Sequence, residues 1–464
     1  MAEHHVVVGG GVAGIGAALR LADAGGSVML VESRPRLGGA ACSFRREGLL
    51  VDNGQHVFLR CCTEYRALLE RIGGTALTTL QPRLDIPVLA EHGQRAALKR
   101  TPGLPAPLHL AASLSRYGLL SMTDRLRAGR AMLGLRRADP GDPKVDAQSF
   151  GAFLRKHGQS DAAIERLWGI IGTATLNAYP DDASLALAAK VFRTGLLSRA
   201  DAADVGYATA PLGALHHTAA RRALEAAGVE VLLRHRVRSV RPGEVLVHTA
   251  AHGERALAAD GIVLALPPEA LTVAPSLAAR GHQKLGGSPI VNVHVIYDRT
   301  VTDLAFAAAV GSPVQWFFDR TEPSGVRERS PDAQYLAVTV SAADDLIDVP
   351  ARDVIAQFTE ALERRLPAAG RASVLDAFVT RERRATFRQA PGTMGLRSGP
   401  DSGVAGIALA GAWTDTGWPD TMESAARSGA AAADLVLSGA FEGEWRPTER
   451  HSTGNAPLNV GGGG

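Results

Sequence analysis

The sequence predicts an α/β protein with two parts of different architecture. A short run of β-branched residues begins at His5, a glycine turn follows, a helix pattern covers 12–24, and a second strand pattern covers 27–32. A strand–helix–strand unit of about thirty residues is typical of a parallel sheet. Between about 80 and 205, Pro and Leu are frequent and helix-like patterns dominate. We therefore expect a parallel-sheet domain of the doubly wound kind and an inserted α+β domain.

Composition excludes several classes of protein. With 46% hydrophobic and 21% charged residues, the chain is expected to be globular rather than disordered or fibrous. A net charge of +3 is too small to predict nucleic-acid binding. Cys42, Cys61 and Cys62 form neither a disulfide framework nor a CxxC pair, and we expect a reducing compartment and no bound metal.

The sequence also favours a cytoplasmic protein. No apolar run reaches the ~18 residues that a spanning helix needs. The first apolar run, from Val6, ends at once in glycines and has no basic region before it, unlike a signal peptide. We expect a cytoplasmic chain, or one bound to the inner face of a membrane.

Strand patterns recur further along, and a helix pattern closes the chain. Residues 229–240 and 244–249 are expected to pair through a turn at 241–243. Residues 138–144 read as a surface linker. The remaining expected elements are strands at 261–266, 291–297, 335–340 and 407–410, and a helix at 421–437.

The first helix begins with a dinucleotide fingerprint, Gly9-x-Gly11-x-x-Gly14. The first glycine permits a tight turn, the second lets the backbone approach a pyrophosphate, and the third lets the helix pack on the strand. Glu32 ends the second strand and is placed to accept hydrogen bonds from an adenosine ribose. The same predicted site includes Val12, Ala13, Ser33 and Arg34. These features predict a Rossmann-like domain.

Two further glycine segments resemble a flavoprotein family. Gly38-Gly39 lies just beyond Glu32, and residues 409–429 combine a strand, a glycine turn and a new helix, whose N-terminus suits the negative edge of a flavin. Together they resemble the family of monoamine oxidases, phytoene desaturases and protoporphyrinogen oxidases. The resemblance implies FAD, with a backbone contact to adenine at Val237. The other contacts it implies are Gly38, Gly39, Gly411, Trp413, Thr421 and Met422.

One position departs from this family. The family usually has Asp after the Ala-Gly pair, where it bonds the ribityl chain, and this chain has Ala412. Either Asp415 substitutes for that residue or the contact is lost.

Other motifs resemble one subgroup, the hydroxysqualene dehydroxylases of hopanoid biosynthesis. The most specific are Asn-Gly-Gln-His at 53–56 and Trp-Thr-Asp-Thr-Gly at 413–417. The resemblance also includes 63–73, 167–180, 288–294, 311–316 and 384–392, and runs from residue 5 to about 440. It implies that reduced flavin replaces the hydroxyl group of hydroxysqualene with hydrogen to give squalene, with an unidentified partner reducing the flavin.

Such a reaction needs a proton donor, because hydroxide is a poor leaving group. His56 is the first candidate, because the pKa of a histidine is ordinarily ~6.5 and lets it hold or release a proton near neutral pH. The alternative is that His56 only hydrogen-bonds the backbone near the flavin. Asp415 is the second candidate for the proton donor; its alternative roles are binding the ribityl chain or capping a helix. Gln55 is expected to position water or flavin. Trp413, Trp418 and Trp316 are candidates for lining the substrate path, and for Trp316 packing in the core is an equal alternative. We expect Cys61 and Cys62 to be two small buried residues rather than a redox pair.

The segment 104–137 is open to two interpretations. Its apolar residues and neighbouring arginines suit the membrane-facing mouth of a lipid-binding domain. They also suit a helix packed on the substrate domain.

Competing functions share this fold. A phytoene-type desaturase would run the flavin in the oxidising direction. An amine oxidase would carry a Lys near the flavin, where this chain has Asn292, and Lys284 is out of register. A prenyl-lipid carrier resembling the Rab escort proteins would have lost the phosphate-binding turn, and a nicotinamide enzyme would not need residues 409–429.

The resemblance also implies the division of the chain. The FAD-binding domain is expected to combine 1–80, 206–270 and 386–440. The substrate domain, for an isoprenoid, is expected to combine 81–205 and 271–385, and 441–464 is expected to be a disordered tail.

Overall fold

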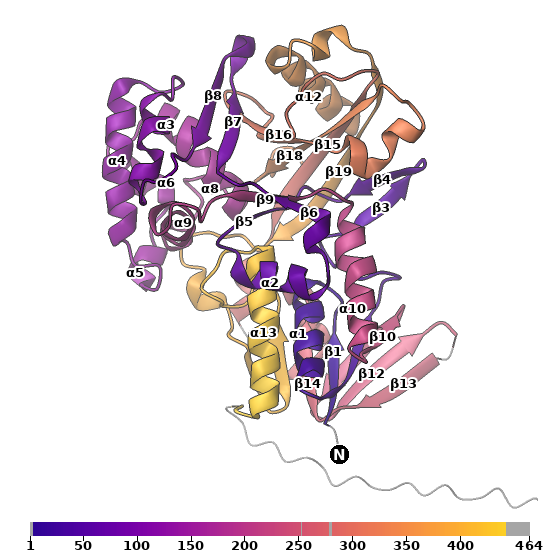
Figure 1. Ribbon diagram of the computed structural model, residues 1–464. Coiled ribbons are helices and arrows are strands. Elements are labelled where there is room, and N and C mark those ends of the chain that lie inside the picture. The colour runs from indigo at the N-terminus through magenta and orange to yellow at the C-terminus, as the bar shows by residue number, and fades with distance from the viewer. Residues whose placement is uncertain (1–2, 252, 278–280, 442–464) are drawn as a thin grey trace, which may run out of the picture.

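The computed structural model describes residues 3–251, 253–277 and 281–441. The tail expected from residue 442 onward therefore lies outside the described residues. Two large sheets stand one above the other, with small sheets and helices between and around them (Figure 1).

The lower sheet has six strands in the order β10-β2-β1-β14-β21-β20. The first five strands are parallel, and the last pairs antiparallel with its neighbour. Their bounds are Glu230–Leu233, Ser27–Glu32, His4–Val8, Gly261–Ala265, Ile407–Ala410 and Asp401–Val404. The parallel sheet predicted from the first strand–helix–strand unit is confirmed.

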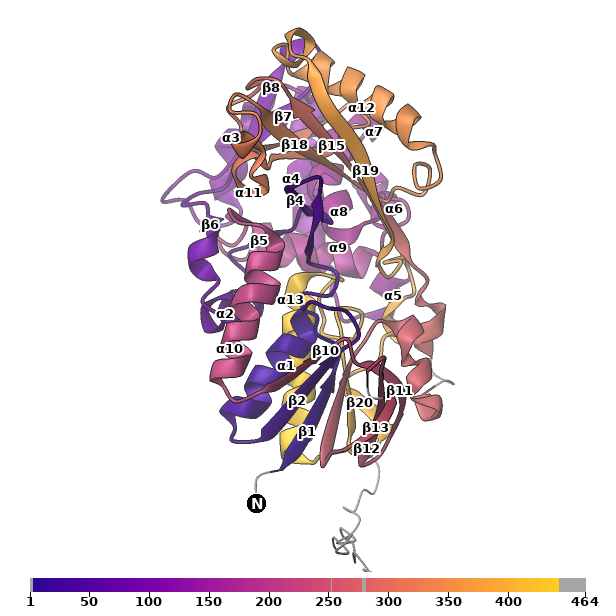
Figure 2. The same cartoon turned by 90° about the vertical axis from the view of Figure 1, so that its right-hand side faces the viewer.

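Both faces of this sheet are covered, which explains why its strands are apolar at successive positions. Val6 and Val8 of β1 pack in one core cluster, together with β11 (Arg236–Arg241), β12 (Glu244–Thr249) and β13 (Gly253–Ala258). Val7 points the other way, into a second cluster formed with α1 (Val12–Asp23), α10 (Ala220–Ala226) and α13 (Met422–Ser438). Figure 2 shows the helices on one side and β11–β13 on the other.

One predicted strand is divided between two sheets. Residues 229–240 do not form a single strand: 230–233 join the parallel sheet beside β2, and 236–241 pair with β12. Arg234 has a φ of 60° and turns the chain between them. The amides of Arg234 and His235 then donate to the carbonyls of Arg34 and Glu32. The hairpin between 236–241 and 244–249 is confirmed, but the single strand from 229 is wrong, because this left-handed turn has no signature in the sequence.

The upper sheet has seven strands in the order β19-β15-β18-β17-β16-β7-β8. Their bounds are Val374–Thr386, Ser288–Tyr297, Gln334–Ser341, Trp316–Asp319, Phe306–Ala309, Asp85–Leu89 and Arg95–Lys99. α12 (Ala351–Arg365) packs on one face through Val354, Phe358 and Leu362. The predicted strands at 291–297 and 335–340 are confirmed as neighbours, since Val293 pairs with Val338.

A helical layer packs beside this sheet (Figure 1). It contains α3 (Ala111–Ser115), α4 (Met122–Arg137), α5 (Pro143–Asp146), α6 (Phe150–Lys156), α7 (Asp161–Ala163), α8 (Gly169–Leu176) and α9 (Leu185–Phe192). The edge-on contacts of Trp168 with Phe150 and Phe192 form its centre. Among the described residues no helix is both long and apolar enough to cross a membrane.

Two small sheets lie between the large ones. β5 (Val57–Leu59), β9 (Val205–Ala208) and β6 (Thr78–Leu80) form one, and β3 (Ser43–Arg46) and β4 (Leu49–Asp52) form the other. α2 (Thr63–Arg71) follows β5, and α11 (Thr321–Ser324) packs against β4. The division of the chain into an FAD-binding and a substrate domain stays a prediction.

Candidate active site

The carboxyl ends of three neighbouring parallel strands meet at one edge of the lower sheet. β1 leads into Gly9, β14 into Leu266, and β21 into Gly411. A ligand that binds an open parallel sheet lies outside this edge. These turns bring Gly9 and Gly411, which belong to segments far apart in the sequence, to the same edge of the sheet.

The turn after β1 has the geometry that its glycines predict. Gly9 has a φ of 105°, and a Cβ on Gly14 would lie 1.8 Å from the Gly9 carbonyl oxygen. Gly11 is different, because a Cβ there would meet only the Cα of Gly39, at 3.8 Å. The first amides of α1, at Val12 and Ala13, have no side-chain cap. An open backbone surface at an uncapped helix N-terminus fits a pyrophosphate.

The Glu32 carboxylate joins two turns of this edge. Its Oε2 accepts from the Gly10 amide at 2.8 Å, and its Oε1 accepts from the Arg34 amide at 2.7 Å and from the Ser33 hydroxyl at 3.2 Å. The side chain is buried. Glu32 therefore orders both sides of the turn in which a ribose is predicted to lie.

The double glycine crosses directly over the fingerprint. The Gly38 amide donates to the Gly10 carbonyl at 2.8 Å, and a Cβ on Gly39 would lie 3.0 Å from the Cα of Gly11. The bulge in β11 at Val237 follows the segment that bonds the backbone at Glu32 and Arg34. The structure thus brings every segment of the predicted nucleotide site to one place.

The turn after β21 is held by interactions within the protein. Gly411 has a φ of 142°, and its amide donates to the Ser428 hydroxyl at 2.9 Å. The indole of Trp413 is buried and donates to the Leu266 carbonyl at 2.9 Å, so this side chain packs in the core. The Arg397 guanidinium donates to the carbonyls of Ala412, Trp413 and Thr414. These bonds fix the shape of the turn, although Ala412 stands where the family usually has an aspartate.

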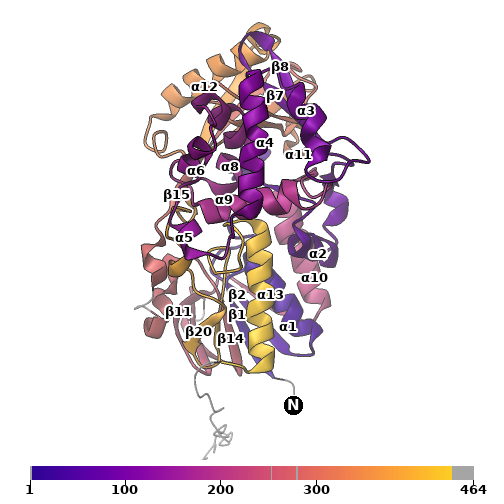
Figure 3. The same cartoon turned by 90° about the vertical axis from the view of Figure 1, so that its left-hand side faces the viewer.

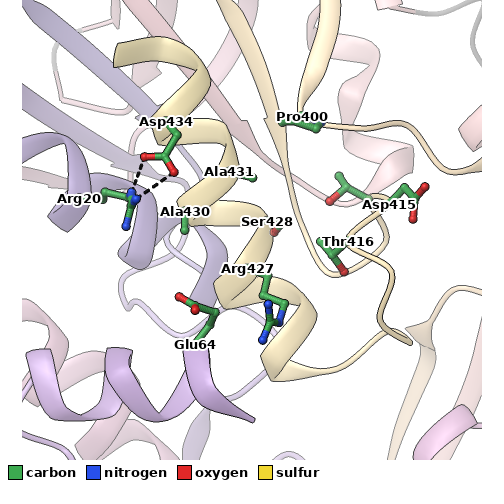
Figure 4. A pocket seen from close by; sticks show the side chains of 11 residues that line it. Arg20, Glu64, Pro400, Asp415, Thr416, Arg427, Ser428, Ala430, Ala431 and Asp434 are labelled. Atoms are coloured by element: carbon green, nitrogen blue, oxygen red, sulfur yellow. Dashed lines mark hydrogen bonds and ion pairs between the residues drawn. The ribbon is translucent and has the colours of Figure 1, made fainter. Parts of the chain in front are cut away.

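Asp415 lies apart from the predicted hydroxyl-binding residues. It is exposed, and its carboxylate accepts from the Gly417 amide at 3.2 Å, which caps its own turn. It lines a pocket on the outer side of α13, with Arg427 and Asp434 of that helix and Arg20 of α1 (Figure 4). Neither Gln55 nor His56 lines this pocket.

Gln55 and His56 line a second, smaller cavity between the two large sheets. Its other lining residues include Asp52, Tyr207, Phe318 and Arg320. The imidazole of His56 is half-buried, and its Nδ1 lies 3.1 Å from the Gly54 carbonyl. A carbonyl only accepts, so Nδ1 carries a hydrogen and, in the neutral ring, Nε2 is left as an acceptor. Burial lowers the pKa of His56, which favours that neutral ring.

A buried ion pair supports the floor of this cavity. Arg320 Nη2 lies 2.7 Å from the Asp52 carboxylate, and both side chains are more than 90% buried. Asp52 also accepts from the Ser43 hydroxyl and from the Leu212 amide. Satisfying the remaining polar atoms in this way is what makes a buried pair tolerable.

Aromatic rings continue from the cavity into the upper sheet. Tyr207 meets Phe306 edge-on with ring centroids 5.6 Å apart, and Phe306 stacks on Phe318 at 5.9 Å. Trp316 stacks on Phe318 at 6.3 Å. Tyr207 and Phe318 line the cavity with Gln55 and His56. Phe306 and Trp316 continue this aromatic wall behind them, so Trp316 packs in the core next to the wall. Trp418 instead lies between Lys190 and Arg427, each 5.0 Å from its ring.

The position expected to carry the amine oxidase lysine holds a structural asparagine. Asn292 is fully buried, donates to the Asn53 carbonyl at 2.9 Å and accepts from the Thr339 hydroxyl at 2.8 Å. Lys284 is exposed. Cys61 and Cys62 are free thiols, the first half-buried and the second buried.

Sequence reasoning missed one titratable residue at the start of α13. Thr421 caps this helix through its hydroxyl, which accepts from the Ser424 amide, and Met422 is the first helical residue. Asp420 precedes them, and its carboxylate accepts from the Phe387 amide at 2.8 Å. Burial raises the pKa of Asp420 to about 6. Its place just before a predicted flavin-binding helix was a signal available in the sequence, but its burial was not.

The comparisons with known proteins agree with this geometry. The model of the flavin-containing amine oxidoreductases matches residues 12–437. Hydroxysqualene dehydroxylase from Rhodopseudomonas palustris is 31% identical, with 93% of this chain and 98% of that protein aligned. The enzyme of the same name from Sinorhizobium fredii is 28% identical, with the same shares aligned. A 15-cis-phytoene desaturase from Synechococcus elongatus is 22% identical over 93% of this chain and 95% of the desaturase.

Solved structures agree in fold. A triple mutant of putrescine oxidase superposes with a TM-score of 0.70 at 19% identity, over 94% of this chain and 99% of that one. This likeness confirms the α/β fold class.

The raised pKa of Asp420 predicts a pH-dependent effect on stability. A carboxyl whose pKa is higher in the folded than in the unfolded state stabilises the fold at low pH and loses that contribution as pH rises through the folded pKa. Asp420→Asn keeps an acceptor for the Phe387 amide and removes the charge. Thermal unfolding should show the variant to be more stable by about 2 kcal/mol near pH 8 and unchanged below about pH 4.

Asp415→Asn, on the same loop but exposed, controls for the loss of a carboxylate. Equal effects of Asp420→Asn at both pH values would show that Asp420 is not held in its buried, protonated form.

Proposed function

The chain belongs to the family of flavin-containing amine oxidoreductases, and from this we propose that it reductively removes the hydroxyl group of hydroxysqualene to form squalene. The observation that carries the proposal is the similarity to hydroxysqualene dehydroxylases over nearly the whole chain. The desaturase similarity is weaker, and Asn292 stands where an amine oxidase would carry lysine. The chain is a flavin-dependent oxidoreductase, and the substrate and direction are what we propose.

We propose that FAD lies along the carboxyl edge of the lower sheet. The pyrophosphate would meet the open backbone at Gly11 and the uncapped amides of Val12 and Ala13. Glu32 would accept from the ribose, and the amide of Met422 at the start of α13 would meet the flavin. The remaining contacts proposed are Gly9, Gly14, Ser33, Arg34, Gly38, Gly39, Val237, Gly411, Trp413 and Thr421. The side chain of Trp413 is turned into the core, so its contact would be through backbone.

The side chains at the cavity beside His56, polar on one side and aromatic on the other, would suit the hydroxyl end of an allylic alcohol. Reduced FAD supplies a hydride when bound. Gln55 and His56 offer the polar groups that would bind the hydroxyl, and the adjoining rings of Tyr207 and Phe318 would exclude water. Aromatic faces also stabilise positive charge developing on an allylic carbon.

Departure of the hydroxyl group requires a proton at its oxygen. His56 would supply the proton in its imidazolium form. The lowered pKa makes this form a stronger acid than an ordinary imidazolium and leaves less of it at neutral pH. Asp420 is a second proton holder, favoured because burial keeps its carboxyl protonated up to about pH 6. Asp415, being exposed and hydrogen-bonded to its own turn, is the weakest of the three candidates.

The proposed reaction places the enzyme in triterpenoid biosynthesis of the hopanoid type. Each turnover would consume the electrons of one reduced flavin, so a separate reductant or redox partner must restore them. A membrane-bound pool of substrate would also favour peripheral contact with a bilayer.

The FAD site predicts the effect of a side chain at Gly11. Gly11 has φ −77° and ψ −179°, which any residue adopts, and open space where a Cβ would lie. Gly11→Val should therefore fold but purify without yellow flavin absorbance. Gly16→Ala in the same helix, where the nearest atom is 4.0 Å away, should keep its flavin. A yellow Gly11→Val protein would remove Gly11 from the site.

The reaction and its direction are tested together by an anaerobic single turnover. The purified holoprotein is reduced, hydroxysqualene is added, the flavin spectrum is followed and the product is extracted. We expect flavin reoxidation with squalene formed. Flavin that stays reduced would overturn the proposal, and turnover of a carotenoid precursor by the oxidised enzyme would replace it with a desaturase.

The same assay measures the role of His56. His56→Ala should keep flavin and lower the single-turnover rate by about 100-fold. In the native enzyme the rate should rise as pH falls toward the lowered pKa of His56, because the imidazolium fraction grows, and the variant should lose this rise. An unchanged rate would remove His56, and loss of rate in Asp420→Asn would then assign the proton to Asp420.

A further inference from the structure

The outer face of α4 carries an apolar stripe that the described part of the chain leaves largely exposed. Met122, Leu126 and Leu133 are 62%, 73% and 53% exposed. They lie at helical spacings of four and seven residues, on one face, with the half-buried Gly129 between them. Figure 3 shows α4 standing upright on the near side of the molecule, at its surface.

The opposite face of the same helix accounts for its attachment to the fold. Asp124, Ala128, Ala131 and Leu135 are buried, at the same helical spacing. Because this face already anchors α4, packing within the protein gives no reason for large apolar side chains on the outer face. Of the eleven large hydrophobic side chains exposed in the described part of the chain, five lie between residues 104 and 133, since Leu104 and Leu108 just before α3 are also exposed.

The charge around the stripe has one sign. Six arginines and a single acid lie between residues 104 and 138, and the acid, Asp124, is buried and hydrogen-bonded to Ser121. The arginines are Arg116, Arg125, Arg127, Arg130, Arg136 and Arg137. Within the described residues none of the six forms an ion pair, whereas Arg20 pairs with Asp434 and Arg155 with Asp181.

The arginines border the stripe on both sides. At about 100° per residue, Arg130 and Arg137 project along one edge of the stripe and Arg136 along the other. Arg125 lies on the same edge as Arg136, but its guanidinium donates to the Ser115 carbonyl. A helix with leucines between two rows of arginines lies in the plane of a bilayer, its apolar side chains among the acyl chains and its cations at anionic headgroups. Arginine side chains reach the headgroups while their stems stay in apolar contact.

We propose that the outer face of α4, with Leu126 and Leu133 at its centre, docks the protein on an anionic lipid surface. The charge excludes a neutral apolar partner, because unpaired arginines would then be desolvated without compensation. A bilayer also fits the exposed leucines before α3, which widen the apolar area. The exposed leucines and arginines support the docking independently of the proposed reaction. It deepens the proposed function in one respect, since a substrate dissolved in a membrane would be met there.

Flotation of the holoprotein with vesicles tests the docking, with flavin absorbance reporting where the protein is. We expect binding to phosphatidylcholine vesicles that contain phosphatidylglycerol, weak binding to pure phosphatidylcholine, and loss of binding at high salt. L126S/L133S should abolish flotation, and R130Q/R137Q should weaken it by about tenfold.

Matched controls come from other exposed positions. Leu375→Ser on β19, where the side chain is 52% exposed, and Arg352→Gln on α12, where it is 86% exposed, should bind as the native protein does. Equal binding by L126S/L133S and the native protein, or no binding to anionic vesicles, would overturn the proposal. The proposal would also be overturned if the native protein is a dimer and L126S/L133S is a monomer, because the stripe would then be an interface between copies. Turnover of detergent-dispersed hydroxysqualene, measured on the same samples, reports the proposed function separately from the docking.

Discussion

The close approach of backbone to backbone at two glycines, Gly14 and Gly429, holds the first helix at the carboxyl edge of the lower sheet. A Cβ on Gly14 would lie 1.8 Å from the Gly9 carbonyl oxygen, and one on Gly429 would lie 2.2 Å from the Ala13 carbonyl oxygen. Helix α1 is therefore held against β1 on one side and against α13 on the other, with no side chain between. This packing brings the N-termini of two helices, separated by about 400 residues of chain, to one edge of one sheet.

The two large sheets are joined across the candidate cavity by buried polar contacts. Arg320, next to the upper sheet, pairs with Asp52 of β4, and Asn292 of β15 bonds the Asn53 backbone two residues before Gln55. These contacts fix the loop that carries Gln55 and His56. The buried side-chain polar atoms of Asp52, Asn53, Asn292 and Arg320 all have partners, and these bonds hold the loop in place.

Burial acts in opposite directions on the pKa values of His56 and Asp420, the two groups proposed here as proton donors. It lowers the pKa of the cationic acid His56 and raises that of the neutral acid Asp420, because in both cases it disfavours the charged form. A dry site suits a reaction in which water would compete with hydride. The same burial favours the neutral imidazole of His56 and the protonated carboxyl of Asp420.

The sequence by itself determined the start of the lower sheet. The glycines at 9 and 14, which the close backbone contacts require, and the apolar period along β1 and α1 are local requirements, and the structure has them where they were predicted. Only the tertiary structure decided what depends on burial and on long-range contacts. Arg234 divides a predicted strand, Asp415 is turned to solvent, Trp413 is turned into the core, and Asp420 is a half-buried acid with a raised pKa. The outer face of α4 is the clearest case, because its leucines and arginines are compatible with a buried or a lipid-facing helix until the packing of Ala128 and Leu135 shows which side is already covered.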